Sequence, residues 1–322
     1  MMMNLWMAVF FLMFSAQTAQ PQDSLTVTLQ GQTIAVVHRT DFTAPVPVAP
    51  MIDDQKYSQF INKIDQQIYR APVNAMINEQ GSIIHGQAGR RLYRQTFKDQ
   101  FYAYFFGFGP SKIELPLLNI YPKVDGELLA NIRVKKIGRY ATYFNAGNTN
   151  RTHNILLAAK AIDNYVVFPN ETFSFNEVVG KRTPDKGYTS APIIVKGEFS
   201  EDIGGGICQV SSTLFNAVDN AGLYIVERYS HSRSVPYVPP GRDATVSWYG
   251  PDLRFQNKYN QPILIRAKQY GGSIEVTLYS SDVINIEPRK IPDPSSQLPE
   301  EIKKQPETQS SRPPGDEKSR YP

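Results

Sequence analysis

Three consecutive glycines, Gly204–Gly206, stand directly before a run typical of a helix, Ile207 to about Ala221, and this junction restricts the fold more than any other feature. A glycine turn that leads into a helix leaves the first backbone N–H groups without partners and exposes the positive end of the helix dipole. Such a helix start can hold an anion or a developing oxyanion. We therefore expect substrate contacts around the junction from Gly205, Gly206, Gln209, Ser211 and Ser212.

The chain has one cysteine, Cys208, and it lies at the start of this predicted helix. A helix start lowers the pKa of a thiol and thereby favours the reactive thiolate. A lone cysteine is more commonly a small buried hydrophobic residue. Here the glycines before it and the polar residues after it argue against a fully apolar pocket. We predict a chemical or ligand-binding role for Cys208.

Two residues farther along the chain complete the set that thiol catalysis needs. His231 and Asp243 both follow the predicted helix, in a stretch that contains several prolines. In thiol catalysis an imidazole takes the thiol proton and a carboxylate orients the imidazole. We predict Cys208 as nucleophile, His231 as base and Asp243 as the orienting group, with the N–H groups near Cys208 and Gln209 as the oxyanion hole. The competing interpretation is that His231 only caps a turn and Asp243 only pairs with Arg242.

Arginines interleaved with aromatic residues indicate what this region binds. Arg233 and Arg242 lie close in sequence to Tyr237, Trp248 and Tyr249. A guanidinium binds a carboxylate through two hydrogen bonds, and aromatic faces stack on flat groups and cations. We expect Arg233 and Arg242 to bind substrate, and we expect that substrate to be a saccharide or peptide that carries carboxylates.

A carboxylate mechanism is the alternative. Glu177 lies among aromatic and apolar residues, where desolvation could raise its pKa to that of a general acid. With Asp243 or Asp202 it could cleave a glycosidic bond, although an exposed position is the simpler interpretation for a glutamate. The four histidines are scattered without the spacing of metal ligands. We expect neither a metal nor a cofactor.

The net charge of the chain and its N-terminal segment indicate where in or outside the cell the protein acts. The formal net charge is only +4 and there is no dense basic stripe, which argues against nucleic acid and suits an anionic polymer at the cell surface. The apolar run Leu5–Phe14 has the length of a signal-peptide core and is too short to span a bilayer. We predict residues 1–22 as a signal peptide, or as a short membrane anchor, and an extracytoplasmic location.

Residues 23–137 read as a first small α+β domain. Alternation of apolar and polar residues predicts a hairpin over Ser24–Val37. Apolar residues at helical spacing predict two helices, over Tyr57–Tyr69 and Leu92–Phe106. The remaining pattern predicts short strands over Val73–Ile77 and Ser82–Ile84, and a strand broken by Pro116 over Lys112–Tyr121.

Residues 144–280 read as a second domain, after a segment rich in Asn, Thr and Gly. We predict a helix over Thr152–Asn164, the Cys208 helix, and a hairpin of Pro262–Lys268 with Ser273–Tyr279. We also predict strands over Ala244–Trp248 and Leu253–Asn257, and a strand or loop over Phe173–Val179. Residues 284–322 are rich in proline and poor in hydrophobic residues, so we predict a disordered tail.

Several unusual short motifs occur in an order that resembles the VanW-like domain of Gram-positive bacteria, over roughly residues 144 to 280. These motifs are Arg151–Ile155, Phe173–Asn176, Gly180–Thr183, Gly187–Tyr188, Gly204–Leu214, His231–Ser232, Tyr237–Val246 and Pro251–Leu253. Residues 50 to 130 more loosely resemble the peptidoglycan-binding domain that often precedes it. Since the family includes accessory proteins of vancomycin-resistance clusters, the resemblance implies an extracytoplasmic role at the cell wall, with peptidoglycan or its stem peptides as partner. It implies no settled reaction.

We thus expect an α+β fold of two small domains with mostly antiparallel strands and a disordered C-terminal tail. The first domain would bind or position wall polymer, and the second would carry the site. Three functions remain open: wall remodelling through the Cys/His site, glycan cleavage by carboxylates, and non-catalytic binding of stem-peptide carboxylates by the arginines.

Overall fold

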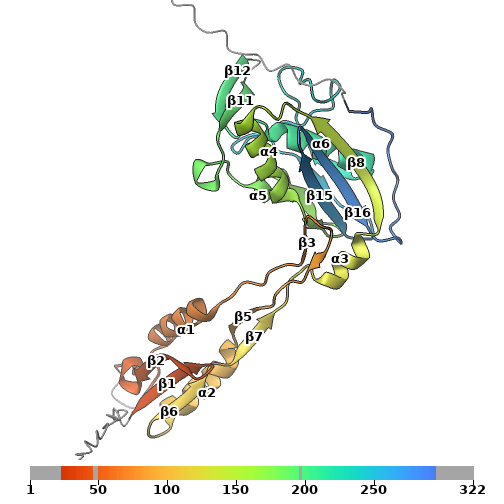
Figure 1. The fold of residues 1–322 in the computed structure, drawn as a ribbon. Helices are drawn as coiled ribbons and strands as arrows, with labels where there is room; N and C mark the ends of the chain where they lie inside the picture. Colours follow the sequence, from red (N-terminus) through yellow and green to blue (C-terminus); the bar gives the residue numbers. More distant parts are fainter. Residues whose placement is uncertain (1–22, 46–49, 196–197, 295–322) are drawn as a thin grey trace, which may run out of the picture. The chain divides into compact units, whose positions relative to one another are not determined.

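The structure is a computed structural model that describes residues 23–45, 50–195 and 198–294. The expected signal peptide, residues 1–22, and residues 295–322 of the expected tail lie outside the described residues. The described chain forms two compact units: 23–76 with Ile84–Gly126, and Ile77–Ile83 with 127–294. Helices and mostly antiparallel strands occur in both (Figure 1), so the predicted α+β class is confirmed. None of the described helices is both long and apolar enough to cross a membrane.

The first unit is built on a three-stranded sheet in the order β2-β1-β6. β1 (Ser24–Leu29) pairs antiparallel with β2 (Gln32–His38), as predicted, and parallel with β6 (Ser111–Glu114). Because β1 is the central strand, nearly all of its residues are buried. α1 (Asp54–Ile68) and α2 (Arg94–Phe106) contribute the aromatic and aliphatic side chains that fill the core against this sheet.

Local capping explains where the elements of the first unit begin. The Asp53 carboxylate accepts the backbone N–H groups of Gln55 and Lys56, each at 3.0 Å, so α1 starts earlier than predicted. Pro116 separates two strands, as predicted. The other elements of this region are η1 (Arg39–Phe42), the pair β5 (Gly89–Leu92) and β7 (Leu117–Ile120), and the short pair β3 (Met76–Ile77) and β4 (Ile83–Ile84).

The second unit is built on a four-stranded antiparallel sheet in the order β8-β16-β15-β9. β15 (Ile263–Tyr270) and β16 (Ser273–Ser280) form the predicted hairpin. β8 (Lys135–Tyr143) and β9 (Val166–Val167) complete the two sides. Their inward side chains are fully buried and supply much of the core of this unit.

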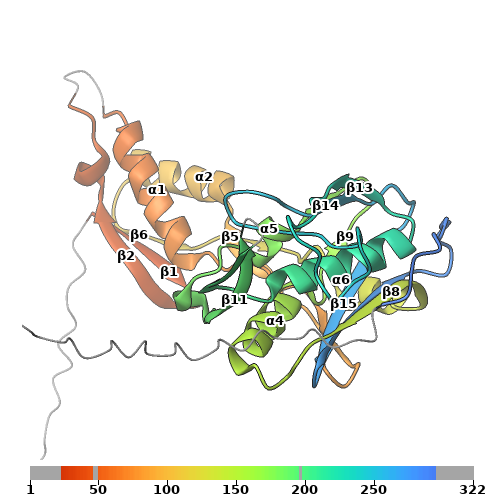
Figure 2. The same ribbon diagram turned by 90° about the horizontal axis from the view of Figure 1, so that it is seen from above.

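Two helices cover one face of this sheet, α4 (Thr149–Ile162) and α6 (Ile207–Asn220) (Figures 1 and 2). α6 packs closely against β8 at Gly138. A Cβ atom there would overlap the carbonyl oxygen of Ala217 and lie 2.9 Å from Cβ of Ala221. Glycine at this position therefore fixes how near α6, which carries Cys208, lies to the sheet.

A smaller sheet in the order β10-β14-β13 lies in the same unit. The segment predicted as strand or loop over Phe173–Val179 is a strand followed at once by a short helix, because the Ser174 hydroxyl accepts the N–H of Glu177 at 3.2 Å and caps the helix. The elements concerned are β10 (Thr172–Ser174), α5 (Phe175–Val179), β13 (Tyr224–Glu227) and β14 (Arg254–Gln256). The remaining elements are α3 (Gly126–Ile132), η2 (Pro184–Lys186), β11 (Ser190–Val195) and β12 (Glu198–Ile203).

The strand predicted over Ala244–Trp248 is wrong. This segment is irregular, because the backbone groups of Ala244 and Val246 bond to side chains of α6 rather than to another strand. The N–H of Ala244 donates to the Ser212 hydroxyl at 2.8 Å, and its carbonyl accepts from the Ser211 hydroxyl at 2.5 Å. The alternation of apolar and polar residues here reflects contact with a helix.

The beginning of the expected tail, which we placed from residue 284, is held against the second unit. Ile284 is 3% exposed, and Ile286 and Ile291 pack against the same core. The Arg289 guanidinium lies 2.8 Å from the Asp219 carboxylate at the end of α6. Three isoleucines bury enough apolar surface to order these residues despite the neighbouring prolines.

Candidate functional site

The structure brings Cys208, His231 and Asp243 together at the start of α6. His231 Nδ1 lies 2.7 Å from Asp243 Oδ2, and the same oxygen accepts the His231 backbone N–H at 2.6 Å. With Nδ1 held by the carboxylate, the imidazole also interacts with the Cys208 thiol. The His231 and Asp243 side chains are 7% and 9% exposed, whereas Cys208 is partly exposed.

The three ionisable groups shift one another in the directions that a thiolate–imidazolium pair requires. Burial raises the pKa of the Cys208 thiol, but the hydrogen bond and charge of His231, together with hydrogen bonds from Val246 and Thr245, outweigh it, so the pKa lies below its ordinary value. Burial opposes the imidazolium, yet hydrogen bonds to Asp243 and Cys208 raise the pKa of His231 to about 9. Burial also works against the Asp243 carboxylate, but His231 holds the pKa of Asp243 below its ordinary value.

The sulfur has further polar neighbours in the irregular segment. Sγ lies 3.6 Å from the Thr245 hydroxyl and accepts the Val246 N–H at 3.5 Å. Of the two backbone N–H groups expected for an oxyanion hole, that of Gln209 already donates to the Gly206 carbonyl at 3.0 Å. The Cys208 N–H has no acceptor among the described residues, so it is the group that remains for an oxyanion.

The two serines that we expected to bind substrate instead hold the segment that carries Asp243. Ser211 and Ser212 are fully buried and bond to Ala244 from both sides of its peptide. Ser212 also donates to the Cys208 carbonyl at 2.7 Å. Ser211 and Ser212 therefore fix Asp243 relative to Cys208.

Gln209 is also used internally. Its side chain is fully buried; Nε2 donates to the Thr142 hydroxyl at 2.9 Å and to the Tyr143 carbonyl at 3.0 Å. Its Oε1 accepts from Arg151 at 2.6 Å. Gln209 thereby ties the start of α6 to β8 and to α4, and has no group left for a ligand.

The two glycines have conformational roles at the same turn. The Gly205 carbonyl accepts from the Asn154 side chain at 3.0 Å. Gly206 is the N-cap of α6 with φ of +103°, and a Cβ there would lie 2.9 Å from Cγ of Arg151. Only glycine can adopt this positive φ and fit into this space without strain.

The two arginines predicted to bind substrate differ. Arg242 Nη1 lies 2.8 Å from Asp219 Oδ2 and Nε donates to Asn216 Oδ1 at 2.7 Å, so Arg242 braces α6. Arg233 is exposed and lines a pocket of about 300 Å³ together with His231 and Asp243. Arg233 therefore lies beside the site, whereas Arg242 is paired within the unit and only its Nη2 has no partner among the described residues.

Glu177, the alternative acid, is exposed at the first turn of α5. The carboxylate mechanism needed an apolar environment around this side chain, and the structure places it at the surface instead. Asp202 is exposed as well.

Arg182 also belongs to this site, although no sequence pattern pointed to it as a site residue. Its Nη1 donates to Asn176 Oδ1 at 2.8 Å, and its Nη2 is buried without a partner among the described residues. Burial lowers the pKa of Arg182, while the neighbouring Cys208 acts in the opposite direction. The only sequence feature that could have pointed to Arg182 is the motif Gly180–Thr183, which contains it and forms part of the resemblance to the VanW-like domain.

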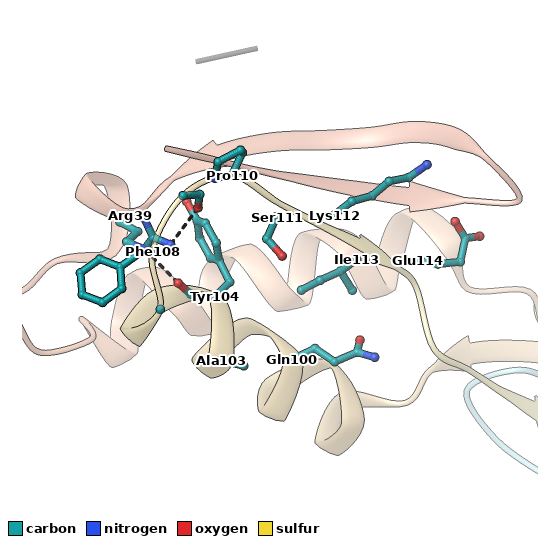
Figure 3. A pocket seen from close by; sticks show the side chains of 12 residues that line it. Arg39, Gln100, Ala103, Tyr104, Phe108, Pro110, Ser111, Lys112, Ile113 and Glu114 are labelled. Carbon is teal, nitrogen blue, oxygen red and sulfur yellow. Dashed lines mark hydrogen bonds between the residues drawn. The ribbon is translucent and has the colours of Figure 1, made fainter. Parts of the chain in front are cut away.

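The first unit has a pocket of its own, of about 410 Å³, between α2, the loop that follows it and β6 (Figure 3). Arg39 donates to the carbonyls of Tyr104 at 2.9 Å and Gly109 at 3.0 Å, so its charge is used within the unit. Phe108 is fully exposed. Its lining has polar and aromatic side chains but no cysteine or histidine.

A family model described as VanW like protein matches residues 150–279. A curated protein of Bacillus subtilis (strain 168), "Uncharacterized protein YoaR", is 69% identical over 287 residues, which cover 89% of this chain and 95% of that relative. The chain belongs to the VanW-like family. The resemblance of residues 144–280 to the VanW-like domain is thereby confirmed, and the looser resemblance of residues 50–130 to a peptidoglycan-binding domain stays a prediction.

This VanW-like protein is also 33% identical over 113 residues to "Vancomycin B-type resistance protein VanW" of Enterococcus faecalis (strain ATCC 700802 / V583), which is 34% of this chain and 41% of that relative. No solved structure matches. The family match contains Arg182, Cys208, His231 and Asp243, so the whole candidate site lies inside the family domain.

Proposed function

We propose that this VanW-like protein is an extracytoplasmic cell-wall enzyme that cleaves or transfers peptide bonds of peptidoglycan through a covalent intermediate on Cys208. The observation that carries the proposal is the hydrogen-bonded His231–Asp243 pair beside the sole thiol of the chain. Nucleophile, base and orienting carboxylate in this arrangement are the requirements of thiol acyl transfer.

The chemistry follows from the groups present. The Cys208 thiolate attacks the carbonyl carbon of a stem-peptide amide, and the Cys208 N–H donates to the oxyanion that forms. His231 gives its proton to the nitrogen of the leaving amine, and the C–N bond breaks to leave a thioester. Neutral His231 then takes a proton from water, the hydroxide adds to the thioester carbonyl, and a carboxylic acid leaves as the thiolate is restored. An amine in place of water gives transfer instead of hydrolysis. Asp243 holds the imidazole throughout.

The wall as the site of action is supported by features outside the catalytic residues. The apolar run Leu5–Phe14 has the length of an export signal, and one relative is named for vancomycin resistance. The first unit would hold wall polymer, and its pocket beside the exposed Phe108 offers the aromatic surface on which a sugar ring stacks.

The proposal is tested by incubating purified cell wall with the protein and identifying released fragments by mass spectrometry. The Cys208→Ala variant should release none, whereas His85→Ala, an exposed histidine of the first unit, should match the wild type. Release by Cys208→Ala at the wild-type rate contradicts thiol catalysis. Fragments with cut sugars point to glycan cleavage, and retention on wall without release points to a binding module.

A further inference from the structure

We propose that Arg182 binds a carboxylate of the substrate beside Cys208, so that the site acts on peptides with a free carboxylate close to the bond that is cleaved. The inference rests on the thiol chemistry proposed above and adds the class of substrate. It is carried by a buried guanidinium nitrogen that has no partner among the described residues, on a side chain that lies against the glycine turn leading to Cys208.

The Arg182 side chain is held in place before any ligand binds. A Cβ on Gly204 would lie 3.2 Å from both Cβ and Cγ of Arg182, so the stem lies against the glycine turn that starts α6. The guanidinium carbon lies 5.9 Å from the centroid of the Phe175 ring. Nη1 donates to Asn176 Oδ1 at 2.8 Å. These contacts set the direction of Nη2.

Nη2 is buried, and no residue in the described part of the chain accepts from it. The neighbouring carboxylate of Asp252 is already satisfied. Its Oδ2 accepts the Ser174 hydroxyl at 2.6 Å, and its Oδ1 accepts the N–H groups of Asn176 at 2.9 Å and Leu253 at 2.8 Å. A buried donor on a cation that lacks an acceptor costs free energy in the free protein, and an anionic ligand would remove that cost.

The ligand chemistry follows from the group and its position. A guanidinium presents a planar set of donors that matches a carboxylate better than a neutral amide. The guanidinium lies within electrostatic reach of the Cys208 sulfur. A peptide whose carbonyl carbon lies on Sγ and whose terminal carboxylate is a few bonds away would reach both groups, and a stem peptide with a free C-terminus has this form.

Two alkylating probes that differ only in a carboxylate test the proposal. Iodoacetate and iodoacetamide both lose iodide to the Cys208 thiolate and leave an S–CH2 bond, and the chain has no other thiol. We expect the ratio of the iodoacetate rate to the iodoacetamide rate to be at least roughly tenfold higher than for a free cysteine peptide at the same pH, because one probe can pair with Arg182.

Three variants separate the charge from the packing of the stem. Arg182→Met keeps the stem and should lower the ratio by roughly tenfold, Arg182→Lys should restore part of it, and Arg139→Gln, which removes an exposed arginine of the same unit, should leave it unchanged. A ratio in Arg182→Met equal to that of the wild type, with both proteins folded by circular dichroism, overturns the proposal. So does an equal fall in Arg139→Gln.

A measurement on the wild-type protein covers the case in which a variant does not fold. N-acetyl-alanine should slow the alkylation of Cys208 by iodoacetamide, and N-acetyl-alanine amide at the same concentration should not. Equal protection by both overturns the carboxylate site. A slow reaction with iodoacetamide in the absence of ligand instead counts against the activated thiol, and the ratio and the protection still report on Arg182.

Discussion

At the scale of single residues, the site depends on one carboxylate oxygen that does two things. Asp243 Oδ2 accepts both the ring N–H and the backbone N–H of His231. The two hydrogen bonds hold the backbone and the imidazole of His231 in a fixed orientation relative to Asp243. The ring then faces Cys208, and the pKa of each group moves toward the charged pair. Arg182 adds a second positive charge near the sulfur.

Replacing His231 with alanine should shift the alkylation of Cys208 to higher pH. In the wild type His231 lowers the pKa of the thiol, so thiolate is present below the ordinary thiol pKa, and the imidazole stays protonated up to about pH 9. Without His231, burial raises the pKa of Cys208, and the iodoacetamide rate at pH 7 should fall by roughly tenfold or more. The rate is measured against pH by mass spectrometry.

His85→Ala is the control for this series and should keep the wild-type profile. Asp243→Asn should move the profile in the same direction as His231→Ala but less far, because the imidazole remains while its charged partner is lost. Superimposable profiles for His231→Ala and the wild type would show that the imidazole does not act on the thiol.

At the scale of elements, α6 organises the site through both its start and its buried polar side chains. The glycine turn sets the position of Cys208, and Ser211 and Ser212 on the next turn bond to the segment that follows Asp243. A helix side chain thus does for this segment what a neighbouring strand does in a sheet. The site is held by one helix and the loop that it binds.

Gly206→Ala should destabilise the protein by about 2–4 kcal/mol, since alanine at positive φ costs about 1–2 kcal/mol and crowding against Arg151 and Ile155 adds to it. Gly271→Ala is the matched control: its φ is also positive, at +53°, but a Cβ there meets nothing within 4 Å. It should cost only about 1–2 kcal/mol. Urea denaturation of the two variants measures the difference, and equal losses would show that crowding at the turn is unimportant.

At the scale of the whole molecule, the candidate catalytic site and the exposed aromatic pocket belong to different units. Every residue of the candidate site belongs to the second unit, whereas the fully exposed Phe108 and its pocket belong to the first. The second unit also extends past its last strand, because residues 284–291 pack on the core near the C-terminal end of α6.

Ile284→Ala should therefore destabilise the protein by about 2–4 kcal/mol, as expected for removing a buried aliphatic side chain. The adjacent Val283 is 62% exposed, so Val283→Ala should change stability by less than about 0.5 kcal/mol. Urea denaturation gives both values. If Ile284→Ala were as stable as Val283→Ala, the packing of residues 284–291 would not matter in solution.

Much of the fold could be predicted because its signals are local. Apolar spacing gave α1, α2 and α4, alternation gave the hairpins β1–β2 and β15–β16, and the glycine turn gave the start of α6. The strand predicted at Ala244–Trp248 failed because alternation records that every second residue is buried, and not whether a strand or a helix buries it.

The sequence by itself determined which residues carry reactive groups and where the backbone turns, because propensity, capping and glycine conformation act over a few neighbouring residues. Only the tertiary structure decided the partners. It placed Asp243 on His231, paired Arg242 with Asp219, exposed Glu177, and left a nitrogen of Arg182 without a partner among the described residues. These outcomes depend on which segments, distant in the sequence, pack together, and local sequence patterns do not determine that.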